Sequence, residues 1–475
     1  MTTEFAPTPA TSAAAPMAGG VPEVTETVAR LRKTFASGRT RSLQWRQAQL
    51  HGIAALMTEN EAKVAAALDA DLGRKPFEAW LADVASTVAE AEYAAKHVKK
   101  WMRPKRYGLE FSQLPARGWV EYEPYGTVLV IGAWNFPFAL TLGPAVAAIA
   151  AGNTVVLKPS EVAPASARLM AELVPKYLDS EAIAVIEGDG AVSQQLIEQG
   201  LDRVFFTGGT EIGRKVYEAA AKHLTPVTLE LGGKSPCIVA ADADIDVAAK
   251  RIAWTKLINS GQTCIAPDYV LADAKIRDEL VTKIGEAVAK FEAGDDTGKP
   301  IVNQRHFERL TSALAATKGT VTIGGGSDAA KARIQPTVVV DPDPNEPLMT
   351  DEIFGPILPV VTVGSADEAI EFINSRPKPL AAYLFTKAKS LRERMVKQVS
   401  AGGMVINHLV FQFATAKLPF GGVGPSGMGA YHGRWGFEEF SHRKGVITKP
   451  TRPDLSSFVY PPYTDKAWKL ARRLF

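Results

Sequence analysis

The chain has 475 residues, of which 46% are hydrophobic and 22% are charged, enough apolar material for the cores of roughly two or three soluble domains. Its 54 basic residues nearly balance its 51 acidic ones and no long basic run occurs, which argues against a nucleic-acid partner. Two cysteines are too few for a disulfide framework, and seven scattered histidines show no metal-site spacing. We therefore expect a cytoplasmic protein, in a reducing compartment, without a metal.

The two ends of the chain differ in composition from the rest. Residues 1–20 have neither the charged start nor the apolar core of a signal peptide, and we expect a disordered arm there. Residues 450–475 form a basic, slightly amphipathic tail, for which a terminal helix is a simpler interpretation than contact with a membrane surface. The longest apolar stretch, 139–151, is too short to span a bilayer, so we expect no stable membrane insertion.

Apolar residues such as Val24, Val28 and Leu31 repeat at helical spacing, and similar patterns predict helices up to about residue 100. Residues 119–126 (WVEYEPYG) then predict an edge strand that a proline turn closes. Beyond them, short apolar runs alternate with amphipathic helical segments, which predicts a parallel sheet covered on both faces. The predicted strands of this first series are 127–132, 153–160, 182–188 and 203–209.

A second α/β series begins with SPCIVA at residues 235–240 and includes a long predicted helix at 275–291. Further strands are predicted up to about residue 363, and again at 381–386 and 402–407. Two consecutive α/β domains account for this pattern. No internal repeat and no long linker interrupts it.

Three glycine-rich stretches imitate nucleotide-binding motifs. GDGAVS (188–193) ends in serine and lacks the acidic partner of a dinucleotide fingerprint. GGKS (232–235) lacks the earlier glycine of a P-loop, because Thr228 stands in its place. GGGS (324–327) is most simply a flexible turn. None of the three identifies a nucleotide site.

The two cysteines have different surroundings. Cys237 lies in the apolar run SPCIVA and is predicted to be part of the core. Cys264 lies in NSGQTCIAPDY (259–269), on a polar turn that contains glycine. A thiolate is more nucleophilic than a serine or lysine side chain at neutral pH. Cys264 is therefore the candidate nucleophile.

Four more motifs accompany the cysteine motif: GAWNFP (132–137), LKPSE (157–161), LELGGKSP (229–236) and EIFGP (352–356). In this order they resemble the aldehyde dehydrogenase superfamily, and the resemblance extends from about Val24 to about Lys449. GQTCIAPDY, LPFGGVGPSGMGAYHG (418–433) and FSHRKG (440–445) are most similar to the class 3 branch. This resemblance implies NAD(P)-dependent oxidation of a hydrophobic aliphatic or aromatic aldehyde to the acid, through a cysteine thiohemiacetal and thioester.

The resemblance also assigns the catalytic roles. Cys264 is the nucleophile, and the Asn135 amide with the Cys264 N–H forms the oxyanion hole. Glu230 is the candidate general base, because a carboxylate between Leu229 and Leu231 is in an apolar setting that raises its pKa. Two plainer interpretations stay open: Asn135 as a turn residue, and Glu230 as a salt-bridged core residue.

The expected cofactor is NAD, and class 3 relatives often accept NADP as well. In FTGGTEIG (206–213), Thr207, Gly208 and Gly213 open a helix whose N-terminus the pyrophosphate approaches. Lys158 and Glu161 resemble the pair beside the adenosine ribose, where a carboxylate repels a 2′-phosphate and so favours NAD.

The motif EIFGP supplies the rest of the expected cofactor site. Glu352 resembles the residue that binds the nicotinamide ribose, and Phe354 packs beside it. A capped turn is the alternative interpretation of this motif.

The family architecture implies an α/β aldehyde dehydrogenase-like fold with a Rossmann-type cofactor domain, an α/β catalytic domain and a small bridging element. The expected boundaries are a cofactor-binding domain at 21–108 and 124–231, a catalytic domain at 232–417, the bridging element at 109–123 and 418–449, and a tail at 450–475. In the family the bridging element completes a sheet across a subunit interface, so we expect a homodimer.

The sequence departs from its relatives at Gly209 and at His408. Gly209 stands where relatives often carry a side chain, and His408 stands where many carry an acidic one. Phe411 and Phe413 lie in the segment 409–415, where relatives line the substrate entrance, although aromatic residues in an apolar run are equally often core.

Three other functions remain as alternatives. A coenzyme A-acylating dehydrogenase shares the thioester, but Glu230 as a hydrolytic base argues against it. A cysteine hydrolase needs a histidine partner, and no histidine lies in a recognisable partner motif. A non-enzymatic binding protein that retains the fold has no need of Cys264, Asn135 and Glu230 together.

Overall fold

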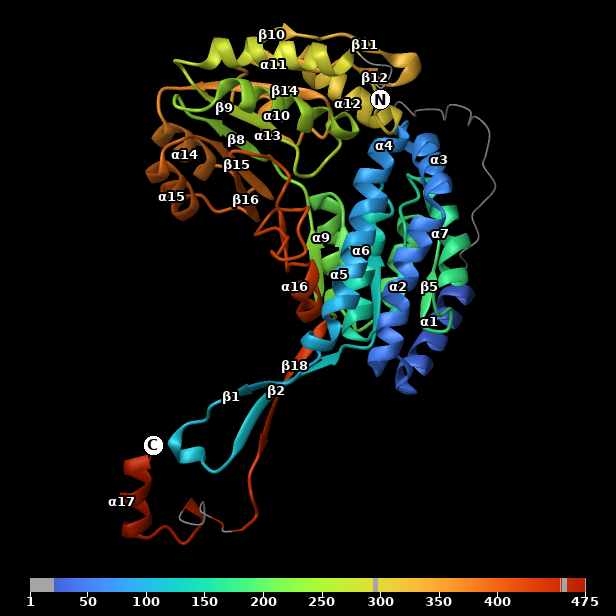
Figure 1. The fold of residues 1–475 in the computed structure, drawn as a ribbon, viewed down its shortest axis with the longest axis vertical. Helices are drawn as coiled ribbons and strands as arrows, with labels where there is room; N and C mark the ends of the chain where they lie inside the picture. The colour runs from blue at the N-terminus through green and yellow to red at the C-terminus, as the bar shows by residue number, and fades with distance from the viewer. Residues whose placement is uncertain (1–20, 294–297, 453, 455–458, 475) are drawn as a thin grey trace, which may run out of the picture.

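The computed structural model describes residues 21–293, 298–452, 454 and 459–474, and the arm predicted at residues 1–20 lies outside them (Figure 1). Two α/β units, each built on its own sheet, lie against each other. A narrow three-stranded sheet projects from them (Figure 1). The predicted α/β class is confirmed.

The first unit contains a six-stranded sheet in the order β17-β7-β6-β3-β4-β5, parallel except for β17. Val128 and Val130 pack into the core on one face, and Leu129 and Ile131 pack into the core on the other. The strands are therefore buried on both faces, as predicted. They are β3 (Thr127–Ile131), β4 (Thr154–Lys158), β5 (Ile183–Val185), β6 (Arg203–Thr207), β7 (Val227–Glu230) and β17 (Gly427–Met428).

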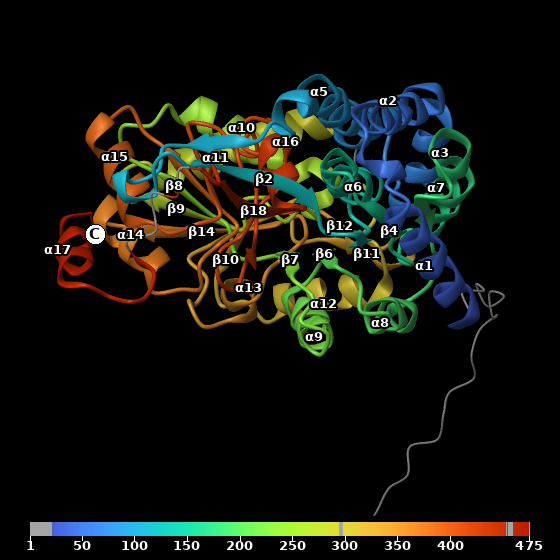
Figure 2. The ribbon, with the colours of Figure 1, turned by 90° about the horizontal axis from the view of Figure 1, so that it is seen from below.

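Helices cover this sheet on both sides. Figure 2 shows α8 and α9 on one side of β6 and β7, and α2, α3, α5, α6 and α7 on the other. Buried Val24 and Leu31 of α1 share a core with β3 and β4. The helices are α1 (Val21–Ala36), α2 (Leu43–Glu59), α3 (Glu61–Leu72), α4 (Pro76–Ala79), the π-helix η2 (Trp80–Ala85), α5 (Ser86–Trp101), α6 (Ala139–Ala151), α7 (Pro164–Tyr177), α8 (Gly190–Glu198) and α9 (Thr210–Ala221).

The second unit contains a seven-stranded sheet in the order β10-β13-β14-β9-β8-β15-β16, parallel except for β10. Its strands are β8 (Pro236–Val239), β9 (Tyr269–Asp273), β10 (Thr320–Ile323), β13 (Thr337–Val340), β14 (Ile357–Val363), β15 (Ala381–Phe385) and β16 (Gly403–Ile406). Cys237 is fully buried in β8, which confirms its predicted core position.

The helices of the second unit pack on both faces of this sheet, with α10 and α11 on one side and α14 and α15 on the other. They are α10 (Ile245–Leu257), α11 (Arg277–Glu292), α12 (Gln304–Ala315), α13 (Pro347–Thr350), α14 (Ala366–Asn374) and α15 (Lys389–Gln398), beside a small hairpin of β11 (Ser327–Asp328) and β12 (Arg333–Ile334). The helix predicted at 275–291 is therefore α11.

The projecting sheet consists of β1 (Lys105–Tyr107), β2 (Arg117–Pro124) and β18 (Ser441–Thr448). From here on, "the arm" means this sheet and not the N-terminal segment 1–20. The prediction that residues 119–126 form an edge strand is wrong, because β2 lies between β1 and β18. Pro124 is the last residue of β2, opposite Ser441, so its missing N–H does not interrupt the ladder.

The C-terminal region returns to the first unit before it enters the arm. There β17 places Gly427 opposite Glu230, and α16 (Gly433–Glu439) packs against α6. The predicted terminal helix is α17 (Asp465–Leu474), which lies beyond the arm (Figure 1). No helix within the described ranges is long and apolar enough to cross a membrane.

Candidate active site

Three of the predicted site residues lie at the carboxyl ends of parallel strands in the six-stranded sheet. Lys158, Thr207 and Glu230 are the last residues of β4, β6 and β7. Because these strands run in the same direction, their last residues lie along one edge of the sheet. Ligands of open α/β sheets bind at this edge, so the fold brings the predicted cofactor and base residues to one place.

Cys264 follows a tight turn that the backbone holds in a rarely used conformation. Asn259, Ser260 and Gly261 all have left-handed φ angles of 49°, 52° and 71°. A Cβ on Gly261 would lie 2.2 Å from the carbonyl oxygen of Gly355, so only glycine fits. The Gln262 side chain fixes the turn from the other side, since its Nε2 donates to the Asn259 carbonyl at 3.0 Å.

The Asn135 side chain reaches the same turn from the first unit. Its Nδ2 donates to the Gln262 carbonyl at 3.1 Å, and the residue is 3% exposed. An asparagine amide has two donor hydrogens, so one remains after this contact. The structure thus brings Asn135 to the loop of Cys264, although the two are 129 positions apart in the sequence.

Burial, followed by the charges of Glu352 and Glu230, raises the pKa of the Cys264 thiol to about 12. The N–H groups of Cys264 and Ile265 oppose this effect. Both carboxylates therefore lie near enough to the sulfur for their charges to act on it. A carboxylate that can accept a proton therefore lies near Cys264, which is the partly exposed one of the two cysteines.

Glu230 is a buried carboxylate without compensation. It is 4% exposed, and neither of its oxygens has a hydrogen-bond partner among the residues that the structure describes. Burial, followed by the negative charge of Glu439, raises its pKa well above the ordinary value. The alternative of a salt-bridged core glutamate does not describe this side chain. An uncompensated buried acid is typical of a functional residue.

Glu352 and Phe354 belong to the second unit, in the segment between α13 and β14. Burial and the nearby charge of Asp268 raise the pKa of Glu352 to about 8, while the Gly233 N–H lowers it. The Arg309 guanidinium donates to the Glu352 carbonyl at 3.1 Å and so holds the backbone here. Phe354 has a left-handed φ of 49°, and its ring meets the edge of Trp134 at a centroid distance of 5.4 Å.

The predicted cofactor loop has a surface that fits a dinucleotide. The Thr207 hydroxyl is buried and has no partner within the described part of the chain. A Cβ on Gly213 would lie 2.5 Å from Leu231 Cδ2, and one on Gly208 would lie 2.5 Å from the ring of Phe206. These glycines let α9 start close to the sheet edge, where its N-terminus suits a pyrophosphate.

Three further residues of the sequence analysis, Gly209, Lys158 and His408, have defined surroundings in the structure. Gly209 precedes α9 with open space where a side chain would be, so its lack of a side chain widens the cofactor loop. Lys158 Nζ contacts Glu161 Oε2 at 2.7 Å. The His408 ring meets Phe411 at a centroid distance of 4.0 Å and so belongs to an aromatic wall.

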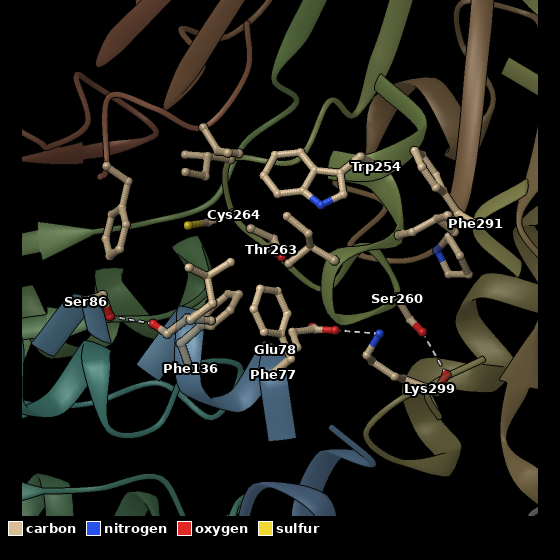
Figure 3. Close-up of a pocket in the computed structure, with 18 of the residues that line it drawn as sticks. Phe77, Glu78, Ser86, Phe136, Trp254, Ser260, Thr263, Cys264, Phe291 and Lys299 are labelled. Atoms are coloured by element: carbon tan, nitrogen blue, oxygen red, sulfur yellow. Dashed lines mark hydrogen bonds and ion pairs between the residues drawn. The ribbon is translucent and has the colours of Figure 1, made fainter. Parts of the chain in front are cut away.

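A pocket of about 600 Å³ leads to Cys264 and Thr263. Figure 3 shows both residues facing the pocket, with Phe77 and Phe136 below them in the view and Trp254 above. Other lining residues are Leu81, Leu140, Leu257, Ile334, Val410, Phe411 and Phe413. Phe411 and Phe413, for which the sequence left two interpretations open, both line the pocket, and Phe413 also packs against the core.

The sequence analysis missed the wall of the pocket that the N-terminal helices supply. Phe77 is 70% exposed and Leu81 is 46% exposed, and both line the pocket. Their spacing of four residues on helical segments was an available signal, because it places two large apolar side chains on one exposed face. Tyr431 was missed too. It is buried, and the charges of Glu230 and Cys264 both raise its pKa.

A thiol, an amide donor, a buried carboxylate and a glycine-containing helix start at the edge of a parallel sheet are typical of the class of oxidoreductases that oxidise carbonyl groups through a cysteine. The profile described as "Aldehyde dehydrogenase family" matches residues 3–446. The chain therefore belongs to the aldehyde dehydrogenase family, and it is an NAD(P)-dependent aldehyde dehydrogenase of the class 3 type.

Named relatives support this class. Aldehyde dehydrogenase family 3 member A2 of Mus musculus is 43% identical over 443 residues, which is 92% of this chain and 91% of the relative. "Aldehyde dehydrogenase, dimeric NADP-preferring" of Rattus norvegicus is 43% identical and covers 92% of this chain and 98% of its own. The solved structure "Substrate bound state of Staphylococcus Aureus AldH" has a TM-score of 0.91 and 39% identity, with 95% and 99% of the two chains covered.

Proposed function

We propose that Cys264, Asn135 and Glu230 carry out aldehyde oxidation through a covalent thioester. The observation that supports this most directly is the state of Glu230, a buried carboxylate with no hydrogen-bond partner in the described ranges whose charge acts on the Cys264 thiol. Burying such a group is costly unless chemistry requires it.

In the first half of the reaction, the Cys264 thiolate bonds to the aldehyde carbon and the π electrons of the carbonyl move to its oxygen. The free donor hydrogen of Asn135 and the N–H of Cys264 stabilise this oxyanion. When bound, NAD(P) supplies the ring that accepts the departing hydride, and its positive charge beside Cys264 favours the thiolate.

In the second half, a water molecule adds to the thioester carbon while Glu230 accepts one of its protons. The carbon–sulfur bond then breaks, the thiolate leaves and the carboxylic acid is released. The raised pKa of Glu230 suits a base that operates near neutral pH. Hydrolysis by this base also distinguishes the enzyme from one that passes the acyl group to coenzyme A.

We assign cofactor binding to the carboxyl edge of the six-stranded sheet and to the segment that carries Glu352. Thr207, Gly208 and Gly213 would hold the pyrophosphate at the start of α9, and Lys158 with Glu161 would contact the adenosine ribose. The Glu161 side chain is 44% exposed and carries a charge that repels a 2′-phosphate, which favours NAD over NADP.

Glu352 and Phe354 would hold the nicotinamide end of the cofactor. The charge of Glu352 acts on the Cys264 thiol, which indicates that the two groups lie near each other. A carboxylate in this place accepts hydrogen bonds from ribose hydroxyl groups.

We propose a hydrophobic aliphatic or aromatic aldehyde as the substrate. The pocket of about 600 Å³ is lined by aromatic and aliphatic side chains up to the thiol. Apolar pockets of this size bind ligands mainly through buried apolar area.

We also propose a homodimer that forms through the arm. The side chains of β1 are exposed, as are most of β18, and Ile447 is 58% exposed. A two-sided open sheet with exposed edges is a template for pairing with another strand. The rat relative at 43% identity is named "dimeric".

A cytoplasmic location fits this chemistry. Cys237 and Cys264 are both free thiols, and a cysteine nucleophile has to stay reduced.

The first expected outcome concerns the base. Glu230→Gln keeps the side-chain shape but removes the proton acceptor, so one equivalent of NADH forms rapidly and turnover then stalls at the acyl-enzyme. Stopped-flow measurement of NADH shows the burst, and Cys264→Ala is the matched control that binds NAD without any burst. Wild-type turnover by Glu230→Gln contradicts the role of Glu230. Formation of an acyl-coenzyme A thioester in place of the free acid, when coenzyme A is added, favours the acyl-transfer alternative.

A second expected outcome concerns pH. Glu439→Gln removes a negative charge that raises the pKa of Glu230, so this pKa falls. Since the ionised carboxylate is the active base, the acidic limb of the kcat profile shifts to lower pH. Glu438→Gln is the control. The Glu438 carboxylate is adjacent in the sequence, but it pairs with Arg434 and is not among the causes of the raised pKa of Glu230. An acidic limb that stays in place in Glu439→Gln refutes the coupling.

The third expected outcome is a dependence on chain length. Each methylene buried in the pocket contributes about 0.8 kcal/mol, so kcat/KM increases about fourfold per carbon from butanal to octanal. Phe411→Ala lowers this slope because it removes part of the pocket wall. Val396→Ala, exposed on α15, leaves the slope unchanged. Equal kcat/KM values along the series, measured with NAD and with NADP, argue against a hydrophobic substrate.

The fourth expected outcome concerns assembly. Analytical ultracentrifugation at micromolar concentration should detect a dimer of the wild-type protein. Ile447→Glu places a charge on the open arm and should shift the protein to monomer, whereas Leu224→Glu, a similar change at a site 91% exposed after α9, should not. A wild-type protein that sediments only as monomer excludes the proposed dimer.

A further inference from the structure

A buried arginine lies between the two loops that form the catalytic centre. Arg74 follows α3, and none of its surface is exposed. Its Nη1 contacts Asp83 Oδ2 at 2.5 Å, its Nε donates to Asn259 Oδ1 at 3.2 Å, and its Nη2 donates to the Asn135 carbonyl. All three nitrogens of the guanidinium thus have an acceptor, and each acceptor is on a different segment of the chain.

Asp83 connects this arginine to the start of α6. Its Oδ1 accepts hydrogen bonds from the N–H groups of Phe138 at 3.0 Å and Ala139 at 2.9 Å. A carboxylate at this position satisfies backbone donors that a helix N-terminus leaves unpaired. The loop that carries Asn135 is therefore fixed at its end by Asp83 and in its middle by Arg74.

Asn259 connects the same arginine to the turn that precedes Cys264. Its Nδ2 donates to the carbonyls of Asn135 and Gln262, both at 3.1 Å. The Asn135 carbonyl thus accepts from both Arg74 and Asn259, so the two loops are joined on their backbone side as well as through the Asn135 amide.

A stabilising role alone does not explain this arrangement. A fully buried ion pair such as Arg74–Asp83 contributes little net stability, because desolvation of both charges offsets their attraction. What the guanidinium provides is a rigid planar fork that fixes three acceptors at set angles, which a lysine ammonium cannot do. The ring of Phe136 lies 4.2 Å from the guanidinium carbon and further restricts its plane.

We propose that Arg74 is a positioning residue for aldehyde oxidation, which sets the place of the Asn135 amide relative to Cys264. This inference rests on the oxyanion role given to Asn135 under the proposed function. Displacement of a catalytic group by about 1 Å costs on the order of 100-fold in rate, so a loss of this fork should reduce the rate without removing any group that contacts substrate.

A double-mutant cycle between Arg74→Lys and Asn135→Ala tests the proposal. Arg74→Lys alone should lower kcat/KM for the aldehyde about 10- to 100-fold, while the Kd for NAD stays within about twofold of wild type. Asn135→Ala alone should lower kcat/KM about 100- to 1,000-fold. In the Asn135→Ala background, Arg74→Lys should cause less than about a twofold further loss, because the group that it positions is gone.

The outcomes separate this proposal from the one on which it rests. If both single variants are impaired and their effects multiply, Arg74 acts independently of Asn135 and the positioning proposal is overturned. If Asn135→Ala retains wild-type kcat/KM, the oxyanion role itself fails and the positioning role fails with it.

Arg46→Lys is a matched control, because Arg46 of α2 is also a buried arginine that contacts α6. Arg46 is 4% exposed, and its Nη1 donates to the Ala150 carbonyl at 3.0 Å, at the opposite end of α6. This change should lower the melting temperature but leave kcat/KM unchanged. If it lowers kcat/KM as much as Arg74→Lys does, a general effect on α6 replaces the positioning role.

A second variant covers the case in which Arg74→Lys does not fold. Asn259→Asp tolerates the left-handed backbone and keeps an acceptor for Arg74, but it cannot donate to the Asn135 carbonyl. Its loss in kcat/KM should likewise disappear in the Asn135→Ala background. A loss that persists there overturns the proposal.

Discussion

The hydrogen bond from Asn135 Nδ2 to the Gln262 carbonyl joins the two α/β units at the centre of the site. One end of this bond lies beside the buried start of α6, and the other lies on a turn that three left-handed residues hold in place. Neither half of the site is complete on its own sheet. The amide comes from the first unit and the thiol from the second, so their geometry depends on how rigidly the two units are held together.

That rigidity allows the protein to keep acidic groups where water cannot stabilise them. Burial raises the pKa values of Glu230 and Glu352, and it also raises the pKa of the Cys264 thiol near them. Each such group lowers the net stability of the fold, which the apolar cores of the two units have to offset. The cores therefore support the chemistry, because their apolar burial offsets the cost of these groups. In a smaller domain with less apolar burial, the carboxylates would be protonated or exposed to water instead.

Much of the fold was predictable because its signals are local. Alternating apolar runs and amphipathic segments predicted the first parallel sheet and a second α/β domain, and motif residues such as Cys264 and Glu230 lie on loops and strand ends whose sequence is distinctive. The position of β2 was not predictable in this way. Its partner β18 is about three hundred residues away in the chain, and nothing in residues 119–126 specifies that pairing.

The same reason explains the residues that sequence reasoning missed. Arg74 and Asp83 look like ordinary charged residues of the helical N-terminal region, and only the folded chain shows that both are fully buried against the Asn135 loop. Phe77 likewise has no motif around it. Its place on the pocket wall depends on how the N-terminal helices pack against the second unit.

The contrast between the two cysteines has a practical consequence. Cys237 is completely enclosed in β8 and burial raises the pKa of its thiol, whereas Cys264 is partly exposed at the end of an open pocket. The native chain is thus already a single-accessible-thiol protein. A fluorophore or spin label attached through sulfur goes to one known point, and no cysteine has to be removed by mutagenesis first.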